Sequence, residues 1–450
     1  MQSKKRSRQM DMLHGSILDK ILLFALPLAA SSILQQLFNS ADAAVAGRFA
    51  GSQALAAVGG NAPVVSLIIN LFVGMSVGAN VIIANYIGQK NTKKVHEAVH
   101  TVYIMALVLG IVMMMMGQLI ARPILILINT PSDVINLATL YLRIYFCGMP
   151  CVMIYNFGAA ILRSVGDTKR PLYCLLISGV INVVLNVFFV VLCHLSVAGV
   201  AIATVIADTV SAGLVTWFLI RSNDIIKLNL RELTLKKEYI KKVVQIGAPA
   251  GLQGAVFSVS NVCIQAGINS FGTAAIAGSA AALNFEYFTY FSTNAFGQAA
   301  VTFVSQNYGA RQFERCKKAL RLSLISGMIV TAFMSIIFVA GRTPFISIYT
   351  NDSAAIQYGI VRMAIVEMFE FIACLYEIPG GALRGIGHSL LPAILTVFGS
   401  CGLRIVWIYT VFHKFHTFQV LMSVYLVTWI VTSILVLGAY TIVTKKVYRT

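Results

Sequence analysis

The stretches LRSVGDTKRP, residues 162–171, and LRGIGHSLLP, residues 383–392, are two copies of one element in a chain of 450 residues. Leu, Arg, Gly and Pro recur in both copies at a single offset of 221 residues. The same offset relates pairs in other segments: Gly51 and Gly272, Gly88 and Gly309, Lys90 and Arg311, Lys94 and Arg315, Pro123 and Pro344, and Tyr155 and Tyr376. One offset that holds in several separate segments predicts an internal repeat.

Long apolar stretches separate these paired elements and predict transmembrane helices. The chain is 58% hydrophobic and 11% charged, whereas an ordinary soluble domain has about 25% charged residues. Residues 21–41 carry no Asp, Glu, Lys or Arg, and about 20 such residues suffice to cross a bilayer. We expect twelve spanning helices, at 17–40, 54–86, 95–120, 133–160, 171–193, 197–220, 243–269, 274–306, 319–341, 354–380, 391–412 and 418–443.

The basic residues predict how these helices are oriented. With twelve spans, 27 of the 34 Lys and Arg residues lie in segments on the side that also carries both termini. The opposite side has four, which are Arg48, Arg122, Arg342 and Lys414. Because cytoplasmic loops are enriched in Lys and Arg, both termini are expected in the cytoplasm. Six helices per half return the chain to its starting side, so the repeats are parallel, as in several transporters.

The longest polar stretch, RSNDIIKLNLRELTLKKEYIKK at residues 221–242, lies at the midpoint of the chain. We interpret it as a cytoplasmic linker between an N-terminal lobe, residues 1–220, and a C-terminal lobe, residues 243–450. The expected fold class is an all-α membrane protein with twelve transmembrane helices in two parallel six-helix lobes. Rocking of two such lobes would expose a cleft between them to each side in turn. A channel is less favoured, because the sequence contains no filter-like loop.

Several other classes of protein are excluded by the sequence. A net charge of +18 would indicate nucleic-acid binding in a soluble protein, but the basic residues occupy short gaps between apolar stretches, so no nucleic-acid partner is expected. The eight cysteines form no CxxC pair, which argues against a metal site or a disulfide framework. The first apolar stretch lacks a signal-peptide cleavage site, so we expect it to be retained. The sequence contains no HExxH, GxSxG or phosphate-loop motif, so an enzyme is not expected.

The paired LRxxGxxxxxP elements, the stretch LFNSADAAVAGRFAG at residues 37–51 and NYGA at residues 307–310 resemble the multidrug and toxic compound extrusion (MATE) transporters. The resemblance covers nearly the whole chain. It implies export of organic, often cationic, compounds by antiport with Na+ or H+, with no cofactor besides the coupling ion. It also implies the V-shaped two-lobe fold of the broader flippase superfamily, and a monomer in contact with lipid as a multi-pass protein of the plasma membrane.

Five polar residues within apolar stretches of the first half are candidates for a cation-coupling site. Asp42 lies in the first predicted helix. Asn182 and Asn186 share one face of the fifth at i, i+4, and Thr204 and Asp208 share one face of the sixth. Charge within a membrane is costly, so such residues are functional candidates. Alternatively, Asp42 could lie at the water boundary, and buried amides could simply join helices.

The resemblance favours the functional interpretation. It implies an essential acid at Asp42, cation-site residues at Asn182 and Thr204, and a further Asp where this chain has Asn186. Because that departure removes one carboxylate, we hypothesise that Asp208 supplies the missing charge, so that Asp42 and Asp208 bind the ion together. Oxygen ligands suit a hard cation such as Na+, whereas the same acids could instead carry protons.

Acidic and aromatic residues predict a substrate site that is mainly in the second half. Three glutamates on the tenth predicted helix are spaced i, i+3 and i+10, which places them on one face of an α-helix. A negatively lined cavity with aromatic faces would suit cationic substrates. The candidate substrate-binding residues are Gln35, Glu286, Glu367, Glu370, Tyr376 and Glu377.

Alternatives remain for both the residues and the function. Glu367 could pair with Arg362, Arg404 or Arg143 for stability. The Arg of each LRxxG element, Arg163 and Arg384, is expected to cap helix carbonyls or to meet lipid phosphate. The alternative function is a flippase for lipid-linked oligosaccharides or cell-wall precursors, which would need a cationic cavity for pyrophosphate. The excess of Glu over Arg in the second half favours drug export, and the residues alone do not choose Na+ from H+.

Overall fold

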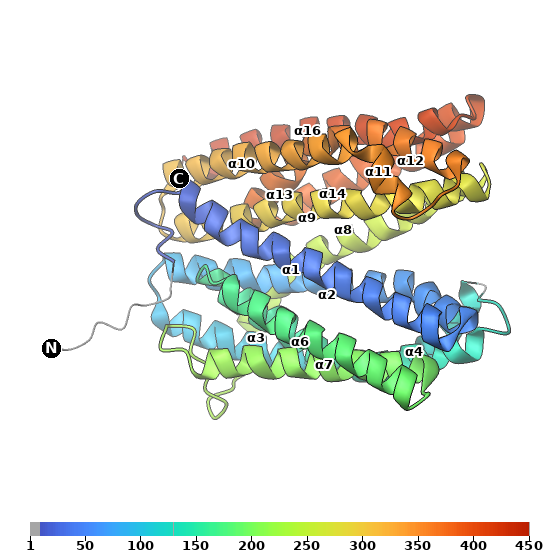
Figure 1. The fold of residues 1–450 in the computed structure, drawn as a ribbon. Helices are drawn as coiled ribbons and strands as arrows, with labels where there is room; N and C mark the ends of the chain where they lie inside the picture. The colour runs from blue at the N-terminus through green and yellow to red at the C-terminus, as the bar shows by residue number, and fades with distance from the viewer. Residues whose placement is uncertain (1–9, 129, 450) are drawn as a thin grey trace. The chain divides into compact units, whose positions relative to one another are not determined.

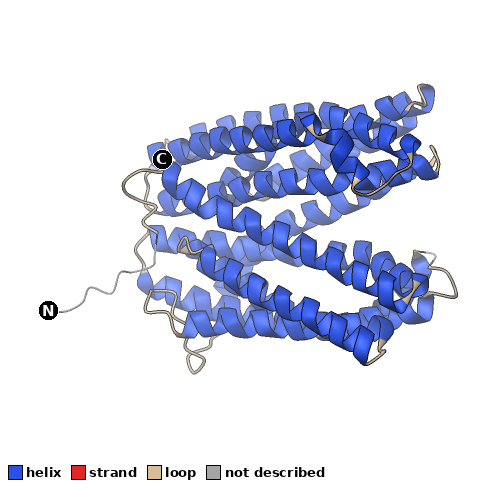
Figure 2. Cartoon of the chain, viewed as in Figure 1, coloured by secondary structure: helices blue, strands red, loops and turns tan. Residues whose placement is uncertain are grey.

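The computed structural model describes residues 10–128 and 130–449, and all regular secondary structure in those ranges is helical (Figure 2). The basic segment before Met10, which we expect in the cytoplasm, lies outside the described residues. The first half (Figure 1) contains α1 (Leu18–Val45), α2 (Ser52–Gly88), α3 (Thr92–Leu127), α4 (Ile135–Cys147), α5 (Met149–Ser164), α6 (Lys169–Val187) and α7 (Ser196–Ile220). The second half contains α8 (Lys237–Asn269), α9 (Thr273–Gly309), α10 (Phe313–Ala340), α11 (Arg342–Ser347), α12 (Ser353–Ile365), α13 (Cys374–Gly385), α14 (Leu390–Thr396), α15 (Leu403–Trp407) and α16 (Phe418–Val447).

Each of the twelve predicted spans coincides with one helix or with a run of consecutive helices. In the described chain, nine helices are long and apolar enough to cross a membrane, and α4 and α5, which meet at a bend of 49°, make a tenth span together. The eighth predicted span is α9, whose many small and polar residues lower its mean hydropathy. The tenth runs from Ser353 to Gly385 and is interrupted.

That interruption corrects the prediction of a single α-helix from 354 to 380. After α12 ends at Ile365, the chain forms a 3₁₀ segment, Glu367–Ala373, before α13 begins. The segment EMFEFIA contains no Pro or Gly, the usual sequence signals of a helix break. A 3₁₀ helix has three residues per turn, so Glu367 and Glu370 lie one above the other. Glu377 lies beyond the segment, and the expected common α-helical face of the three glutamates does not exist.

The 221-residue repeat extends to unusual backbone conformations. Three pairs of residues at this offset have positive φ angles: Gly51 and Gly272 (92° and 87°), Lys90 and Arg311 (56° in both), and Gly166 and Gly387 (85° and 91°). In the two LRxxG turns, the glycine N–H donates to the carbonyl of the Arg three residues earlier at 2.9 Å in both copies. Because residues with a side chain rarely adopt a left-handed backbone, its recurrence at Lys90 and Arg311 confirms that the two halves share a detailed backbone plan.

The described chain forms two compact units that do not divide at its midpoint. The first unit comprises residues 30–244 with Met10 and Asp11, and the second comprises residues 12–29 with the chain from Gln245 onward. The beginning of α1 therefore belongs to the second unit, and the beginning of α8 belongs to the first. Each half of the chain contributes the start of its first helix to the unit formed mainly by the other half.

Contacts within the second unit hold the N-terminal segment, residues 12–29. Asn307 Nδ2 and Arg315 Nε both donate to the carbonyl oxygen of Met12, each at 3.2 Å. Phe24 is fully buried and meets Phe303 edge to face, with ring centroids 5.9 Å apart. This segment is thus fixed by both a polar anchor and an aromatic contact.

Contacts within the first unit hold the linker and the start of α8. Residues 221–236 contain turns but no regular helix, and α8 begins at Lys237 inside the stretch predicted as linker. The Tyr239 hydroxyl donates to Glu97 at 2.7 Å, and Lys236 forms an ion pair with the same carboxylate at 2.7 Å. Lys242 Nζ donates to the Tyr86 hydroxyl at 2.9 Å. The linker is therefore attached to α3 and α2 rather than solvated along its length.

Candidate functional site

A hydrogen-bonded cluster in the first unit joins α1, α6 and α7 through four of the five predicted coupling residues. Asn186 Nδ2 donates to Asp42 Oδ1 at 2.5 Å and to Asn182 Oδ1 at 3.2 Å. The Thr204 hydroxyl donates to Asp42 Oδ2 at 3.4 Å. The same hydroxyl oxygen accepts from Asn182 Nδ2, also at 3.4 Å. Both carboxylate oxygens of Asp42 thus meet polar partners from other helices.

The cluster is buried and rich in oxygen atoms. Asp42 is 7% exposed, Asn182 is 5% exposed and Asn186 is fully buried. Asn186 Oδ1 has no hydrogen-bond partner in the described chain, although a buried amide oxygen normally has one. Carboxylate, amide and hydroxyl oxygens are the ligands that hard cations take. The donor set therefore fits Na+, and the unpartnered Asn186 oxygen leaves one more ligand available.

Asp208, the fifth predicted residue, lies one helical turn beyond Thr204 on α7. Its carboxylate shares none of the hydrogen bonds that the structure describes for the cluster, although its charge interacts with that of Asp42. No described Lys or Arg forms an ion pair with either acid. The structure thus brings four of the five residues into direct contact and leaves Asp208 as a neighbouring second carboxylate.

The acidic residues of the second unit lie in a different environment. Arg362 donates from Nε to Glu286 Oε1 at 2.6 Å and from Nη2 to Oε2 at 2.8 Å, a bidentate pair between α12 and α9. The two side chains are 3% and 8% exposed. Arg362, one of the three possible partners considered for Glu367, is therefore paired with Glu286 instead.

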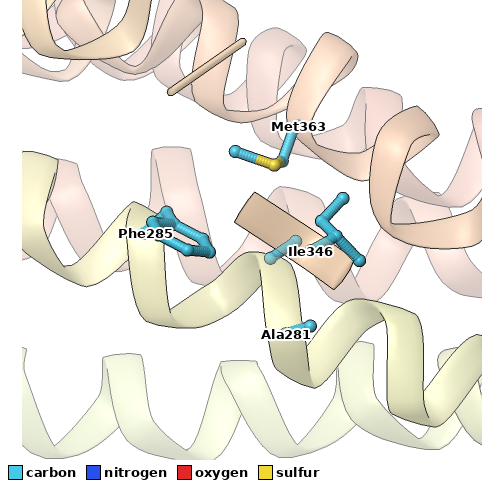
Figure 3. Close-up of a cluster of buried hydrophobic side chains, with 5 residues drawn as sticks. Ala281, Phe285, Ile346 and Met363 are labelled. Atoms are coloured by element: carbon cyan, nitrogen blue, oxygen red, sulfur yellow. The ribbon is translucent and has the colours of Figure 1, made fainter. Parts of the chain in front are cut away.

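An apolar cluster adjoins this ion pair. It contains Phe285 and Ala281 of α9, Ile346 of α11 and Met363 of α12, with their side chains directed toward one another (Figure 3). Phe285 and Met363 are the chain neighbours of Glu286 and Arg362. Because this packing fixes α9 against α12, it also fixes the geometry of the ion pair.

Arg384, from the second LRxxG element, points into its own unit. It lies 3.3 Å from Glu377 Oε1 and donates to Gln253 Oε1 at 3.0 Å. Its guanidinium thus contacts side chains of α13 and α8. The expectation that this Arg caps helix carbonyls or meets lipid phosphate is therefore wrong. The charge of Glu377 is offset by the same contact.

The carboxylates of Glu367 and Glu370 form no ion pair with a basic residue in the described chain. Glu367 is fully buried and accepts from Thr289 at 2.6 Å, whereas Glu370 is 4% exposed. The Oε2 atom of each has no hydrogen-bond partner in the described chain. Two of the four predicted glutamates are therefore paired with Arg, and the predicted negative lining now depends on Glu367 and Glu370.

The two remaining substrate candidates lie in different units. Tyr376 of α13 is 4% exposed in the second unit. Gln35 of α1 is exposed in the first unit. The structure describes no hydrogen bond between either side chain and the predicted glutamates.

Arg404 is a buried charge that the sequence indicated only as a possible partner of Glu367. It is 2% exposed, and its guanidinium lies 4.5 Å from the ring centroid of Tyr425 and 5.4 Å from that of Phe257. Nη1 donates to Asn261 Oδ1 at 2.9 Å. Within the described residues no carboxylate pairs with it, and its Nε has no hydrogen-bond partner. Its position in a long apolar stretch was the available signal.

A family model, MatE, matches residues 27–188 and again residues 249–410, once in each half of the chain. The chain belongs to the MATE family. Members of this family are transporters rather than enzymes.

This MATE protein is similar over its length to named relatives. It is 26% identical over 444 residues to the probable multidrug resistance protein YoeA of Bacillus subtilis, which covers 96% of this chain and 95% of the relative. It is 26% identical over 381 residues to the probable multidrug resistance protein NorM of Thermotoga maritima, covering 84% and 82%. A solved outward-facing MATE transporter matches 99% of this chain and 100% of its own, with a TM-score of 0.93 at 19% identity. The fold class is confirmed as an all-α, multi-pass membrane protein with the two six-helix lobes of MATE transporters.

Proposed function

We propose that this MATE protein exports organic compounds across the plasma membrane by alternating access, driven by inward movement of Na+ or H+. The observation that carries the proposal is the buried cluster of Asp42, Asn182, Asn186 and Thr204. A buried carboxylate without a basic partner is costly unless a cation or a proton neutralises it. The names of YoeA and NorM, both given as multidrug resistance proteins, support organic compounds as the cargo. We further propose a monomer in contact with lipid, with both termini cytoplasmic.

The cluster is suited to release of its ion on each side in turn. Its residues come from three helices, α1, α6 and α7, so a small displacement of any one helix changes the distances among the oxygens. Pro27 lies inside α1 and removes a backbone hydrogen bond there, which allows this helix to bend. Bending of α1 would move Asp42 relative to Asn186, and so couple the ion site to the conformation of the transporter.

A gradient experiment tests the proposal and separates the two ions. Inverted membrane vesicles containing the protein are given either a Na+ gradient or a pH gradient at equal membrane potential, and uptake of ethidium is followed by fluorescence. We expect uptake to follow one of the gradients in the wild type and neither in Asp42→Asn. A Cys263→Ser variant, at the position 221 residues away, is the matched control and retains uptake. Absence of gradient-driven uptake of any organic cation would turn the assignment toward the flippase.

Asp208 is proposed to supply the second charge of the ion site. Its charge interacts with Asp42, and the chain has Asn186 where the family resemblance implies an Asp. If Asp208→Asn leaves ion-driven uptake at the wild-type rate while Asp42→Asn abolishes it, the compensating role of Asp208 is refuted.

The second unit is proposed to contact substrate through ionisable groups that have no ion-pair partner among the described residues. Glu367 and Glu370 offer carboxylates to cationic groups, whereas Arg404 offers a guanidinium to anionic groups. Arg362 and Arg384 are offset by Glu286 and Glu377, so the strongly cationic cavity that a pyrophosphate-linked cargo needs is not favoured. The expected cargo is an aromatic organic compound with one or a few charges rather than a lipid pyrophosphate.

A further inference from the structure

We propose that the first unit binds one divalent transition-metal ion, of the zinc class, between α3 and the linker. The ligands are His96 and His100 of α3 and Glu232 of the linker, whose ligand atoms all lie within 4.8 Å of one another. None of these three residues belongs to the proposed ion or substrate sites. The inference is therefore independent of the proposed export function.

Two of the three ligands already have a spacing that suits a shared metal. His96 Nε2 lies 3.0 Å from Glu232 Oε2. Two ligands that each lie about 2.0–2.1 Å from a tetrahedral Zn2+ are separated by about 3.3 Å. A small outward shift of either side chain would therefore admit the ion between them.

The third ligand is supplied by the helix. His96 and His100 are one turn apart on the same face of α3, with ring centroids 4.0 Å apart. His100 Nδ1 lies 2.7 Å from the carbonyl oxygen of His96, and only a protonated ring nitrogen can bond to a carbonyl. Nε2 of the neutral ring therefore carries the free electron pair. Metal-bound histidines commonly donate their other ring N–H to a backbone carbonyl in this way.

One existing contact must be exchanged for the metal. His100 Nε2 accepts from the backbone N–H of Asn229 at 3.0 Å, and a metal would take this electron pair instead. Asn229 Nδ2 also donates to Glu232 Oε1 at 2.5 Å, which orients the carboxylate while leaving Oε2 for the ion. The exchange costs one ordinary hydrogen bond, about 1 kcal/mol.

The ligand types select the ion. Two imidazoles and one carboxylate suit Zn2+ and similar ions, whereas Mg2+ and Ca2+ prefer all-oxygen sites. The side chains of His96 and Glu232 are 43% and 54% exposed, so water can complete a four-coordinate shell.

Binding at this site would fasten the linker to α3. The linker already meets α3 where Thr101 Oγ1 donates to the Thr234 carbonyl at 3.1 Å, and it leads directly into α8. A metal that joins Glu232 to both histidines would add a further attachment, four residues before Lys236. We therefore expect the bound metal to slow proteolytic cleavage and amide hydrogen exchange in residues 221–236.

Metal titration of the full-length purified protein in detergent, after treatment with EDTA, tests this proposal. Zn2+ binding is measured by calorimetry, and Co2+ absorption between about 500 and 650 nm reports a four-coordinate site. We expect one equivalent to bind, with Glu232→Gln and His96→Ala each weakening the affinity at least tenfold. His413→Ala is the matched control, because His413 and His416 form another closely spaced exposed pair without a described carboxylate, and its affinity should equal that of the wild type.

Controls distinguish a loss of the metal site from misfolding of the variant and from nonspecific metal binding. Each variant must keep the wild-type melting temperature in EDTA. The proposal is overturned if the wild type binds no stoichiometric Zn2+, if His96→Ala and Glu232→Gln leave the affinity unchanged, or if Mg2+ competes at equal concentration. Hydrogen exchange of residues 221–236 should slow when Zn2+ is added to the wild type and stay the same in Glu232→Gln.

Discussion

The buried cluster around Asp42 in the first unit consists of one carboxylate, two amides and a hydroxyl, whereas the second unit has two Glu–Arg ion pairs, Glu286–Arg362 and Glu377–Arg384. The backbone repeat relates the two units, yet the residues 221 positions from Asp42, Asn182 and Thr204 are Cys263, Leu403 and Tyr425. In the other direction, Glu286 and Arg362 correspond to Val65 and Tyr141, and Arg404 corresponds to Val183.

The difference shows that the residues of the turns and those of the interiors are constrained by different physical requirements. Each turn needs a left-handed residue to reverse the chain, so Gly51 and Gly166 have glycine counterparts in the second half. A buried interior needs only to be filled and electrically balanced. The halves therefore share their turns and diverge in their charged groups, which agrees with the proposal that the first unit couples to the ion and the second contacts substrate.

The largest expected effect is on stability, at the Glu286–Arg362 pair. Glu286→Gln should lower the free energy of unfolding by about 3–5 kcal/mol, because it leaves a buried guanidinium uncompensated. Unfolding in mixed micelles measures the change. Glu314→Gln, which removes the exposed pair with Lys317, is the control and should cost less than about 1 kcal/mol. Equal losses in the two variants would remove the distinction between a buried and a solvated pair.

The next largest effect is on transport, at Asp42. Asp42→Asn should reduce ion-driven export at least a hundredfold, since no other carboxylate accepts from both Asn186 and Thr204 in the described cluster. A hundredfold change corresponds to about 2.7 kcal/mol. Initial rates in vesicles report the change, with Cys263→Ser as its counterpart in the second half. If both variants transport normally, the first unit does not carry the coupling site.

A smaller effect concerns substrate charge in the second unit. Arg404→Gln should lower transport of anionic aromatic compounds about tenfold and leave cationic ones nearly unchanged, because its guanidinium has no described carboxylate partner. Glu370→Gln should have the reverse selectivity. Competition assays with paired cationic and anionic dyes compare the variants. The same loss for both dyes in either variant would indicate a structural role and contradict the assignment.

The smallest effect tests the shared turns. Lys90 and Arg311 both have φ of 56°, a conformation that disfavours side chains by about 1 kcal/mol or more. Glycine there relieves this strain but increases the entropy of the unfolded chain. Lys90→Gly and Arg311→Gly should each stabilise the protein by under about 1 kcal/mol, and by the same amount. A clear difference between them in thermal unfolding would show that the turns are not equivalent.

The helices could be predicted because their signals are local, whereas the grouping of Asp42 with Asn182 and Thr204, which are far from it in the sequence, was implied by the resemblance to MATE transporters. Asn182 and Asn186 reveal a common face through their spacing alone, and glycines 221 residues apart reveal the repeat. The pairing of Glu286 with Arg362 could not be predicted, because 76 residues separate them and no periodicity relates two helices. The 3₁₀ segment was also missed, since Glu367–Ala373 contains no Pro or Gly to signal a break in the helix. Arg384 was misassigned in part because one of its two partners, Gln253, lies 131 residues away.

The exchanged start of α1 sets an order for biosynthesis. Asn307, which anchors Met12, leaves the ribosome 295 residues after it. At about 5–20 residues per second, this gap lasts roughly 15–60 s. During that time Phe24 has no Phe303 to meet, and the nascent N-terminal helix must be covered by lipid or by the translocation machinery. The first unit can complete most of its packing early, whereas the second closes only after residues 12–29 are joined by the chain from Gln245 onward.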